Sequence, residues 1–362
     1  MYKSEGKIGT KELFSIIILV IGTKLTDNTP LIFFDDLSNG AWMAILFIFL
    51  FSLLPIYFMT RVMALYPEMN LIEVTNHLLG KHLGPFVLFG LWLLLTYSIV
   101  STSAVYTDII GTMYFTKTPT MIIYFLLMGV SVYIAKKGLE NIGSASWMTI
   151  TSIKISLLVV LILAYFKGET AFLFPLFGEG ELRIIKESAL TTSIYAEFLF
   201  FALIATNVKN ISSYKKGIWF ALVIVTVEIT LALIAYVLLF DYKGVHLLNY
   251  PFHETIRLIE LGFITNVESM FFPFWLIATF LRFAFLLYLA AFLFGGIFKI
   301  KKFEYIIPTL GTIILFLGLI PETPVFKFTS NREIFLNIST PIFIFLPFLL
   351  WISAKIKGDY KK

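Results

Sequence analysis

The stretch Ile21-Gly22-Thr23-Lys24-Leu25-Thr26-Asp27-Asn28-Thr29-Pro30 interrupts an otherwise apolar segment that covers residues 13–34. A helix of about 20 apolar residues crosses a bilayer, so this segment is long enough to do so. Its middle, however, contains a glycine, a proline and two charged side chains. A charge near the bilayer midplane costs roughly 2.5 to 3.5 kcal/mol on insertion scales, so it persists only with a partner, water or a ligand.

Two interpretations of this interruption are open. A broken first helix with polar residues at the break is typical of the binding site of transporter-like proteins. The alternative is a kinked helix in which Lys24 and Asp27 satisfy each other locally. Under the first interpretation, the candidate ligand-binding residues are Gly22, Thr23, Lys24, Thr26 and Asp27.

The composition is that of an all-α polytopic membrane protein. The 362 residues are 59% hydrophobic and only 14% charged, whereas soluble proteins are about half apolar and a quarter charged. No hydrophilic segment is long enough to build a separate core, so we expect a single transmembrane domain over 1–362. The chain has no cysteine, which excludes disulfides and thiolate chemistry.

Apolar runs bounded by charge, proline or glycine predict ten membrane-spanning helices, which place both termini on one side. Seventeen of the 28 Lys and Arg residues then fall on that side and eight on the other, so we expect cytoplasmic termini. Basic cytoplasmic loops facing anionic lipid account for the net charge of +5, and no nucleic-acid partner is indicated. The predicted spans are 13–34, 41–65, 86–114, 119–135, 147–166, 189–208, 218–240, 270–298, 303–320 and 335–354.

Ten spans divide into two halves of five, and an odd number per half inverts the second half relative to the first. The repeats would cover about 1–166 and 189–354, making the sixth span the counterpart of the first. That span opens with a polar, β-branched stretch and continues with apolar residues, but it lacks Gly and Pro. We therefore add Tyr195, Glu197 and Phe198 at this second possible break to the candidate ligand-binding residues.

Other polar residues within the spans have two possible roles. Glu228 and Arg282 lie near mid-depth in neighbouring spans, so we predict a structural ion pair between them. Tyr97 and Ser101 share one face of the third span. That face either lines the ligand cavity or packs against another helix, as small and polar stripes commonly do.

Motifs of enzymes are missing from the sequence. It has no phosphate-binding glycine loop, dinucleotide fingerprint or Gly-x-Ser-x-Gly motif. The four histidines fall in predicted loops without paired metal-ligand spacing, so we interpret each as a surface residue. We therefore expect no enzyme activity, no cofactor and no metal site.

Several stretches, in this order and spacing, resemble the B subunits of spore nutrient-germinant receptors, the endospore germination permeases. After the second span come Tyr66-Pro67-Glu68-Met69-Asn70-Leu71-Ile72-Glu73 and Leu79-Gly80-Lys81-His82-Leu83-Gly84. Before and into the eighth span come Tyr250-Pro251, Arg257 and the run from Glu268 to Trp275. The resemblance extends over nearly the whole chain.

This resemblance implies membership of the amino acid, polyamine and organocation transporter superfamily, with the leucine-transporter fold and a ligand site at the breaks of helices one and six. In sodium-independent members a lysine on the fifth helix replaces a sodium ion, a role that matches Lys154. The family context implies a multi-pass protein of the spore inner membrane or cell membrane. The resemblance implies that its function is to bind a small nutrient, expected to be an amino acid, between helices one, three, six and eight and to signal through companion A and C subunits.

Two other functions remain open from the sequence. One is a proton-coupled, sodium-independent amino-acid permease. The other is a scaffold or a water or ion conduit with a vestigial pocket. The single glycine at the break, Gly22, and the nearby Lys24 differ from the glycine-rich break of typical transporters. This favours a site that holds a ligand over one that cycles a substrate rapidly.

Overall fold

The computed structural model describes residues 6–259, 267–320 and 324–359, with only the backbone given for 324–331. Nearly all of this part of the chain is helical. The long and short α-helices, in chain order, are α1 (Thr10–Gly22), α2 (Thr29–Leu37), α3 (Ala41–Leu65), α4 (Leu71–Ile109), α5 (Thr120–Lys136), α6 (Leu139–Lys167), α7 (Glu181–Leu190), α8 (Glu197–Phe200), α9 (Ile211–Val245), α10 (Pro251–Leu258), α11 (Val267–Ile297), α12 (Ile306–Gly318) and α13 (Pro324–Ile356).

Membrane-spanning helices are recognised here by length and apolar character. Within the described residues, six helices meet both criteria, and a seventh does so if the bent helix pair between Glu181 and Asn207 counts as one span. Two shorter apolar helices, Thr120–Lys136 and Phe303–Gly318, add to these. The protein is therefore a multi-pass membrane protein, while the number of ten spans and the inverted repeat stay predictions.

Helix 1 consists of α1, a 3-10 turn η1 (Thr23–Leu25) and α2, with a non-helical stretch before α2. The sequence explains the interruption. α1 ends at Gly22, and Pro30 lies in the first turn of α2, where its missing N–H leaves no hydrogen bond unmade. The side chain of Asp27 accepts a hydrogen bond of 2.7 Å from the amide of Thr29, which satisfies one of the free donors at the start of α2.

The sixth predicted span, called helix 6 below and distinct from α6, is also broken. It consists of α7, the 3-10 helix η5 (Thr192–Tyr195), α8 and the 3-10 helix η6 (Phe201–Asn207), and its two arms are bent by 50°. The break contains neither Gly nor Pro. Instead, the hydroxyl groups of Thr191 and Thr192 bond back to the carbonyls of Glu187 and Ser188, a local bonding pattern that bends helices.

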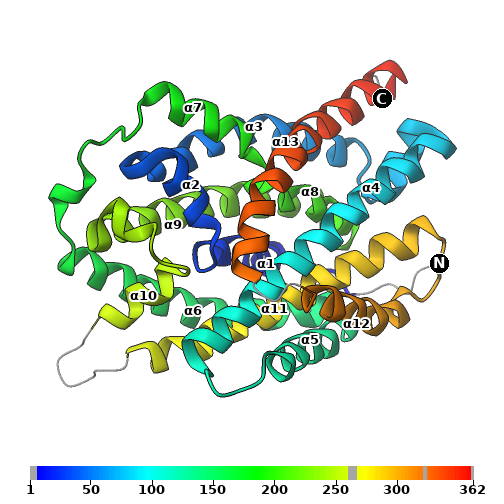
Figure 1. Ribbon diagram of the computed structural model, residues 1–362. Coiled ribbons are helices and arrows are strands. Elements are labelled where there is room, and N and C mark those ends of the chain that lie inside the picture. Colours follow the sequence, from blue (N-terminus) through cyan, green and yellow to red (C-terminus); the bar gives the residue numbers. More distant parts are fainter. Residues whose placement is uncertain (1–5, 260–266, 321–323, 360–362) are drawn as a thin grey trace.

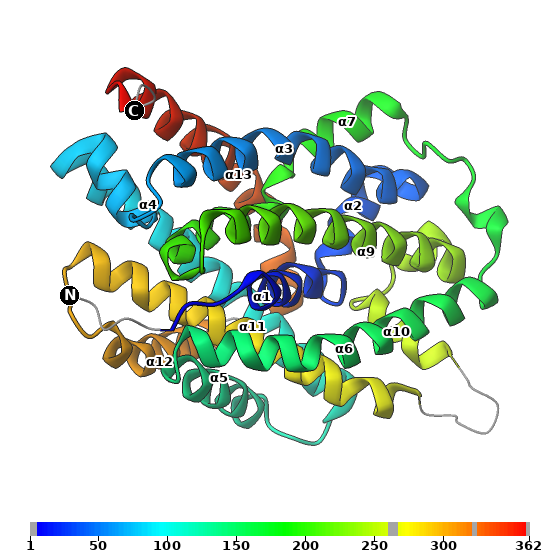
Figure 2. The ribbon, with the colours of Figure 1, turned by 180° about the vertical axis from the view of Figure 1, so that it is seen from behind.

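The first half of helix 1 is the centre of the bundle. α1 packs against α9, α6 and α11, and Figure 2 shows it nearly end-on among them. Its side chains from Ile16 to Ile21 are all buried, as expected for a helix that is apolar all round. α13 packs against α3 and α4 on the far side of the break, while α12 and α5 lie at the periphery (Figure 1). The break is thus enclosed on all sides by other helices.

Helix 1 is tied to helix 6 at its beginning as well. Ile8, just before α1, forms a parallel β-bridge with Val208 at the end of helix 6. Its amide donates to the carbonyl of Asn207 at 2.9 Å, and its own carbonyl accepts from the amide of Lys209 at 3.0 Å. Backbone hydrogen bonds therefore join the start of helix 1 to the end of helix 6.

Candidate functional site

The two breaks are joined by a buried ion pair between Lys24 of η1 and Glu197 of α8. The ammonium of Lys24 also donates to the carbonyl of Ile194 at 2.5 Å. Lys24 is 5% exposed and Glu197 is 6% exposed. The alternative of a local Lys24–Asp27 pair is therefore wrong, because the partner of Lys24 comes from helix 6. In an environment so poor in water, each charge depends on the other.

Asp27 is paired with Arg332, a residue at the start of the span in α13. Arg332 donates through Nη2 to Asp27 at 3.3 Å and through Nη1 to the side chain of Asn28 at 2.7 Å. Asp27 is fully buried. No pattern in the sequence predicts this contact, because Arg332 lies just outside the predicted span 335–354 and far from Asp27 along the chain.

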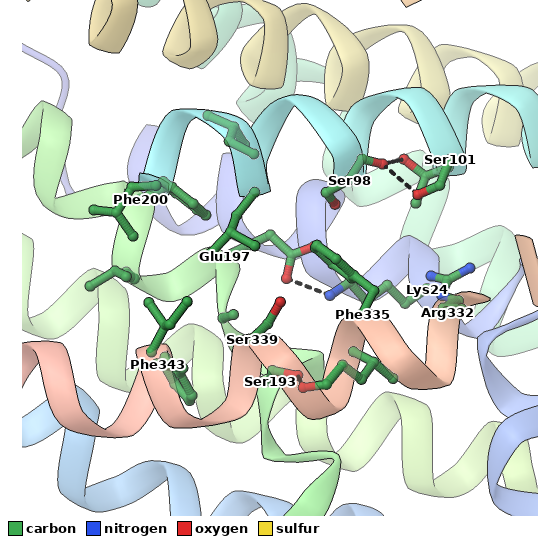
Figure 3. A pocket seen from close by; sticks show the side chains of 18 residues that line it. Lys24, Ser98, Ser101, Ser193, Glu197, Phe200, Arg332, Phe335, Ser339 and Phe343 are labelled. Carbon is green, nitrogen blue, oxygen red and sulfur yellow. Dashed lines mark hydrogen bonds and ion pairs between the residues drawn. The ribbon is translucent and has the colours of Figure 1, made fainter. Parts of the chain in front are cut away.

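A cavity of about 50 Å³ lies beside the Lys24–Glu197 pair (Figure 3). Four serines and three phenylalanines are among its lining residues, so it is mainly apolar with a few polar groups, as ligand sites are. Typical pockets for drug-sized ligands measure about 300 to 1,000 Å³, so this one is small by comparison. Its lining comes from Lys24, from Leu91, Leu94, Leu95, Ser98, Ser101 and Thr102 of α4, from Ser193, Ala196, Glu197, Leu199 and Phe200 of helix 6, and from Arg332, Phe335, Leu336, Ser339, Ile342 and Phe343 of α13.

Three of the predicted ligand-binding residues line this cavity: Lys24, Ser101 and Glu197. Tyr97 does not line the cavity, but its ring packs on that of the lining residue Phe335, with 4.8 Å between the ring centroids. We expected the eighth helix, α11, to form one wall, but the lining instead comes from α13. The reason is that α11 contacts helix 1 from the opposite side.

The remaining predicted residues of helix 6 bond or pack elsewhere. The hydroxyl of Tyr195 shares a hydrogen bond of 2.9 Å with that of Thr226 in α9. Phe198 is buried and lines a separate void of about 10 Å³. Both residues therefore support the shape of the break from outside the cavity.

On the α11 side, polar side chains hold the η1 turn in place. Trp275 donates through Nε1 to the hydroxyl of Thr26 at 2.9 Å, and Tyr106 of α4 donates to the carbonyl of Thr23 at 2.9 Å. Arg282 donates through Nη1 to the hydroxyl of Thr23 at 2.7 Å. Thr23 and Thr26 thus serve here as attachment points for neighbouring helices.

The predicted ion pair between Glu228 and Arg282 is wrong. Glu228 of α9 pairs instead with Lys154 of α6, at 2.6 Å between Oε2 and Nζ. This pair lies against Gly22, where an added Cβ would be 3.2 Å from the Glu228 carboxylate and 3.5 Å from the Lys154 ammonium. Lys154 therefore reaches the end of α1, but its role as a sodium substitute stays a prediction.

The short helix α10 packs on the same region from the loop that precedes α11. His253 is fully buried, shares a hydrogen bond of 2.8 Å with the hydroxyl of Tyr114 and packs edge-on against Trp275. It is therefore not the surface residue we expected. Burial, together with the positive charge of Arg257, lowers the pKa of His253 to about 3, so the ring is neutral at physiological pH.

A second residue beside α10 is tied to α4. Tyr250 donates its hydroxyl to the carboxylate of Asp108 at 2.5 Å, and burial and that negative charge raise its pKa well above the usual value. No group of three or more His, Cys, Asp or Glu side chains in the described part of the chain is arranged to hold a metal ion.

The arrangement of two broken helices around a small, charged cavity can be compared with known proteins. A family model described as "Spore germination protein" matches residues 7–326. The chain belongs to the spore germination protein family. Spore germination protein KB of Bacillus subtilis (strain 168) is 24% identical over 353 residues, covering 96% of this chain and 92% of that protein. Spore germination protein YndE of the same strain is 22% identical over 369 residues, covering 98% of each chain.

Among solved structures, this member of the spore germination protein family is similar to MhsT in complex with L-phenylalanine. The TM-score is 0.59 with 15% sequence identity, and the similarity covers 97% of this chain and 89% of that one. This confirms the predicted leucine-transporter-like fold. Both the family and the fold are those of permeases and transporters rather than of enzymes.

Proposed function

We propose that this protein is the membrane subunit of a spore nutrient-germinant receptor, that it binds an amino acid in the cavity beside Lys24 and Glu197, and that it signals through companion A and C subunits. The observation that carries the proposal is the ion pair between the two broken helices. An amino acid has one carboxylate and one ammonium group. Its carboxylate can pair with Lys24 and its ammonium with Glu197, so that neither buried charge is left unpaired.

The backbone at the break supports binding through side chains. The amide of Thr26 already donates to the carbonyl of Thr23 at 2.9 Å, which makes it unavailable to a carboxylate. The cations at the cavity, Lys24 and Arg332, then become the groups that receive the carboxylate, while Glu197 receives the ammonium. Charge-assisted hydrogen bonds of this kind are the strong ones in proteins.

The size of the cavity links binding to a change in shape. At about 50 Å³, the cavity has to widen before an amino acid fits. Its walls, α4 and α13, are in contact with each other and with helix 1 or helix 6. A ligand that fits only the wider arrangement shifts the bundle toward that arrangement, and this differential affinity is all that signalling requires.

Equilibrium binding of radiolabelled amino acids to the purified protein tests the proposal. We expect saturable binding of at least one amino acid and its loss in Glu197→Gln, which keeps the shape of the side chain but cannot neutralise an ammonium. Glu304→Gln, in the 3-10 turn that precedes α12 and away from the cavity, is the matched control and should bind normally. Absence of binding by the unmutated protein, or normal binding by Glu197→Gln, would contradict the proposal.

A proton-coupled permease is the second candidate, favoured by the Lys154–Glu228 pair at the end of α1, where a charge change would affect the break. Uptake into proteoliposomes separates the two functions. Concentrative amino-acid uptake that requires a proton gradient supports the permease. Binding without such uptake, together with genes for A and C subunits next to this one, supports the receptor.

A further inference from the structure

Arg282 of α11 is fully buried, yet only part of its guanidinium group is bonded. Nη1 donates to the hydroxyl of Thr23 at 2.7 Å and approaches the hydroxyl of Tyr106 at 3.4 Å. The group also stacks over the ring of Tyr106 at 5.4 Å. Nε and Nη2 have no hydrogen-bond partner among the residues that the structure describes. These two nitrogens form one edge of the guanidinium, the edge that binds a carboxylate with two parallel hydrogen bonds.

The charges around the break do not balance at this position. Lys24 is paired with Glu197, and Arg332 with Asp27. Arg282 has no carboxylate partner in residues 6–259, 267–320 or 332–359, although it lies close enough to Lys24 for the two cations to interact electrostatically. An arginine keeps its charge in proteins, and an uncompensated buried charge is strongly destabilising. The group that completes this site is therefore a negative charge.

We propose that the Nε–Nη2 edge of Arg282 binds a small monovalent anion, either a carboxylate or a halide, beside the broken turn of helix 1. The same guanidinium donates a hydrogen bond to Thr23 of η1 through Nη1. The bound anion therefore holds Arg282 in the position that connects η1 to α11. A cavity of about 30 Å³ lies on this side of the break; Thr23, which Arg282 contacts, and Trp275 and Ala278 of α11 are among its lining residues, whereas Arg282 itself is not. The anion is a free ion, or the carboxylate of a nutrient that binds at Arg282 instead of at Lys24 and Arg332, and only the second source rests on the nutrient binding of the proposed function.

Thermal unfolding of the purified protein in detergent tests this without any nutrient. Sodium bromide or sodium formate is titrated against sodium sulfate at constant ionic strength. We expect a saturable rise in the Tm of the unmutated protein, because an ion that binds only the folded state stabilises it by mass action. Arg282→Gln should show no saturable rise. Arg282→Lys keeps the positive charge but lacks the two parallel N–H donors of the guanidinium. It should need about tenfold more anion to reach half of the rise in Tm.

The matched control is Arg183→Gln in α7, where a half-exposed arginine near two acidic side chains is removed. It should respond to bromide as the unmutated protein does. Should Arg282→Gln fail to fold, crystals of the unmutated protein soaked in bromide provide the answer, with an anomalous peak expected at Nε and Nη2. The proposal is overturned if neither anion gives a saturable rise and no peak appears, or if the Arg282 variants respond like the unmutated protein.

Competition then separates the two sources of the anion. If the anion is the carboxylate of the nutrient, the bound amino acid displaces bromide, while the amine that lacks the carboxylate does not. If the anion is a free ion, bromide stays bound when the amino acid binds. Failure of amino-acid binding removes only this last comparison and leaves the bromide titration as an independent result.

Discussion

The buried charges at the break of helix 1 have partners on other helices, so each ion pair is also a connection between two helices. Lys24 connects helix 1 to helix 6, Asp27 connects it to α13, and the Lys154–Glu228 pair connects α6 to α9 against Gly22. Pairs of this kind contribute little net stability, but losing one partner is costly. The charged residues at the break therefore join helix 1 to helix 6 and to α13.

For the Lys24–Glu197 pair, we predict strong coupling between the two positions. Lys24→Met or Glu197→Met alone should lower the free energy of unfolding by about 3 to 5 kcal/mol, because the remaining charge is left buried. The double variant should be more stable than either single one, because no charge remains. Thermal unfolding of the four proteins gives the coupling energy. The half-exposed pair Arg183–Glu179 is the control, where losses should be below about 1 kcal/mol and additive. Additive losses at Lys24 and Glu197 would contradict the prediction.

Gly22 provides a second prediction at this scale. In Gly22→Val the new Cβ lies 3.2 Å from the Glu228 carboxylate and 3.5 Å from Lys154, so the ion pair has to shift. We expect a loss of about 1 to 3 kcal/mol in the free energy of unfolding, measured by chemical denaturation in detergent. Gly90→Val in α4, where a Cβ meets nothing within 4 Å, is the control. An equal loss of unfolding free energy in Gly22→Val and Gly90→Val would show that the close contact at Gly22 does not cause the loss.

At the scale of elements, the sequence predicts the break of helix 1 well and the cavity less well. Gly22 and Pro30 act on the backbone next to them, so a local pattern is sufficient to place the break. The residue Arg332 could not be found in this way, because its partner Asp27 lies 305 positions away in the chain. Spacing along one helix says which residues share a face, but not which other helix that face meets.

Family motifs that looked arbitrary in the sequence have structural roles. Asn70 and Glu73 form a capping box at the start of α4, and Gly80 has a φ of 85° at the kink of that helix, a value that glycine adopts easily. Arg257 of α10 forms an ion pair with Glu268 at 3.0 Å and donates to the carbonyl of Met113 at 2.6 Å. The motif residues around α10 therefore dock this short helix on α4 and α11.

Docking of α10 should depend on pH through His253. The folded protein holds this ring neutral, with a pKa of about 3, whereas the unfolded chain binds a proton near pH 6.5. The unfolded state thus binds more protons between these values, so stability falls as the pH decreases through this window. At pH 5 the loss attributable to His253 should be about 2 kcal/mol relative to pH 8.

Thermal unfolding of the unmutated protein and of His253→Phe at pH 8 and pH 5 measures this contribution. The unmutated protein should lose more stability than the variant, since other groups titrate equally in both. His82→Phe, at an exposed position of α4, should behave like the unmutated protein. An identical pH dependence in His253→Phe would contradict the assignment.

For the whole molecule, the orientation in the membrane follows from the distribution of basic residues and stays a prediction. The chain contains no cysteine, so single cysteines can be introduced without background labelling. In intact cells, a membrane-impermeant maleimide should label Lys117→Cys, between α4 and α5. It should label Lys301→Cys, after α11, only once the cells are made permeable. The reverse pattern would place the termini outside and overturn the predicted topology.

The small size of the cavity also has a consequence for timing. Under the proposed function, a nutrient fits only after α4 and α13 have moved apart, so we predict that the rate of association is limited by how often these helices separate. At high nutrient concentration the observed rate should therefore reach a plateau instead of rising in proportion. Under the proposed function, brief contact with the nutrient would then give no response, because a molecule that arrives while the two helices are together does not bind.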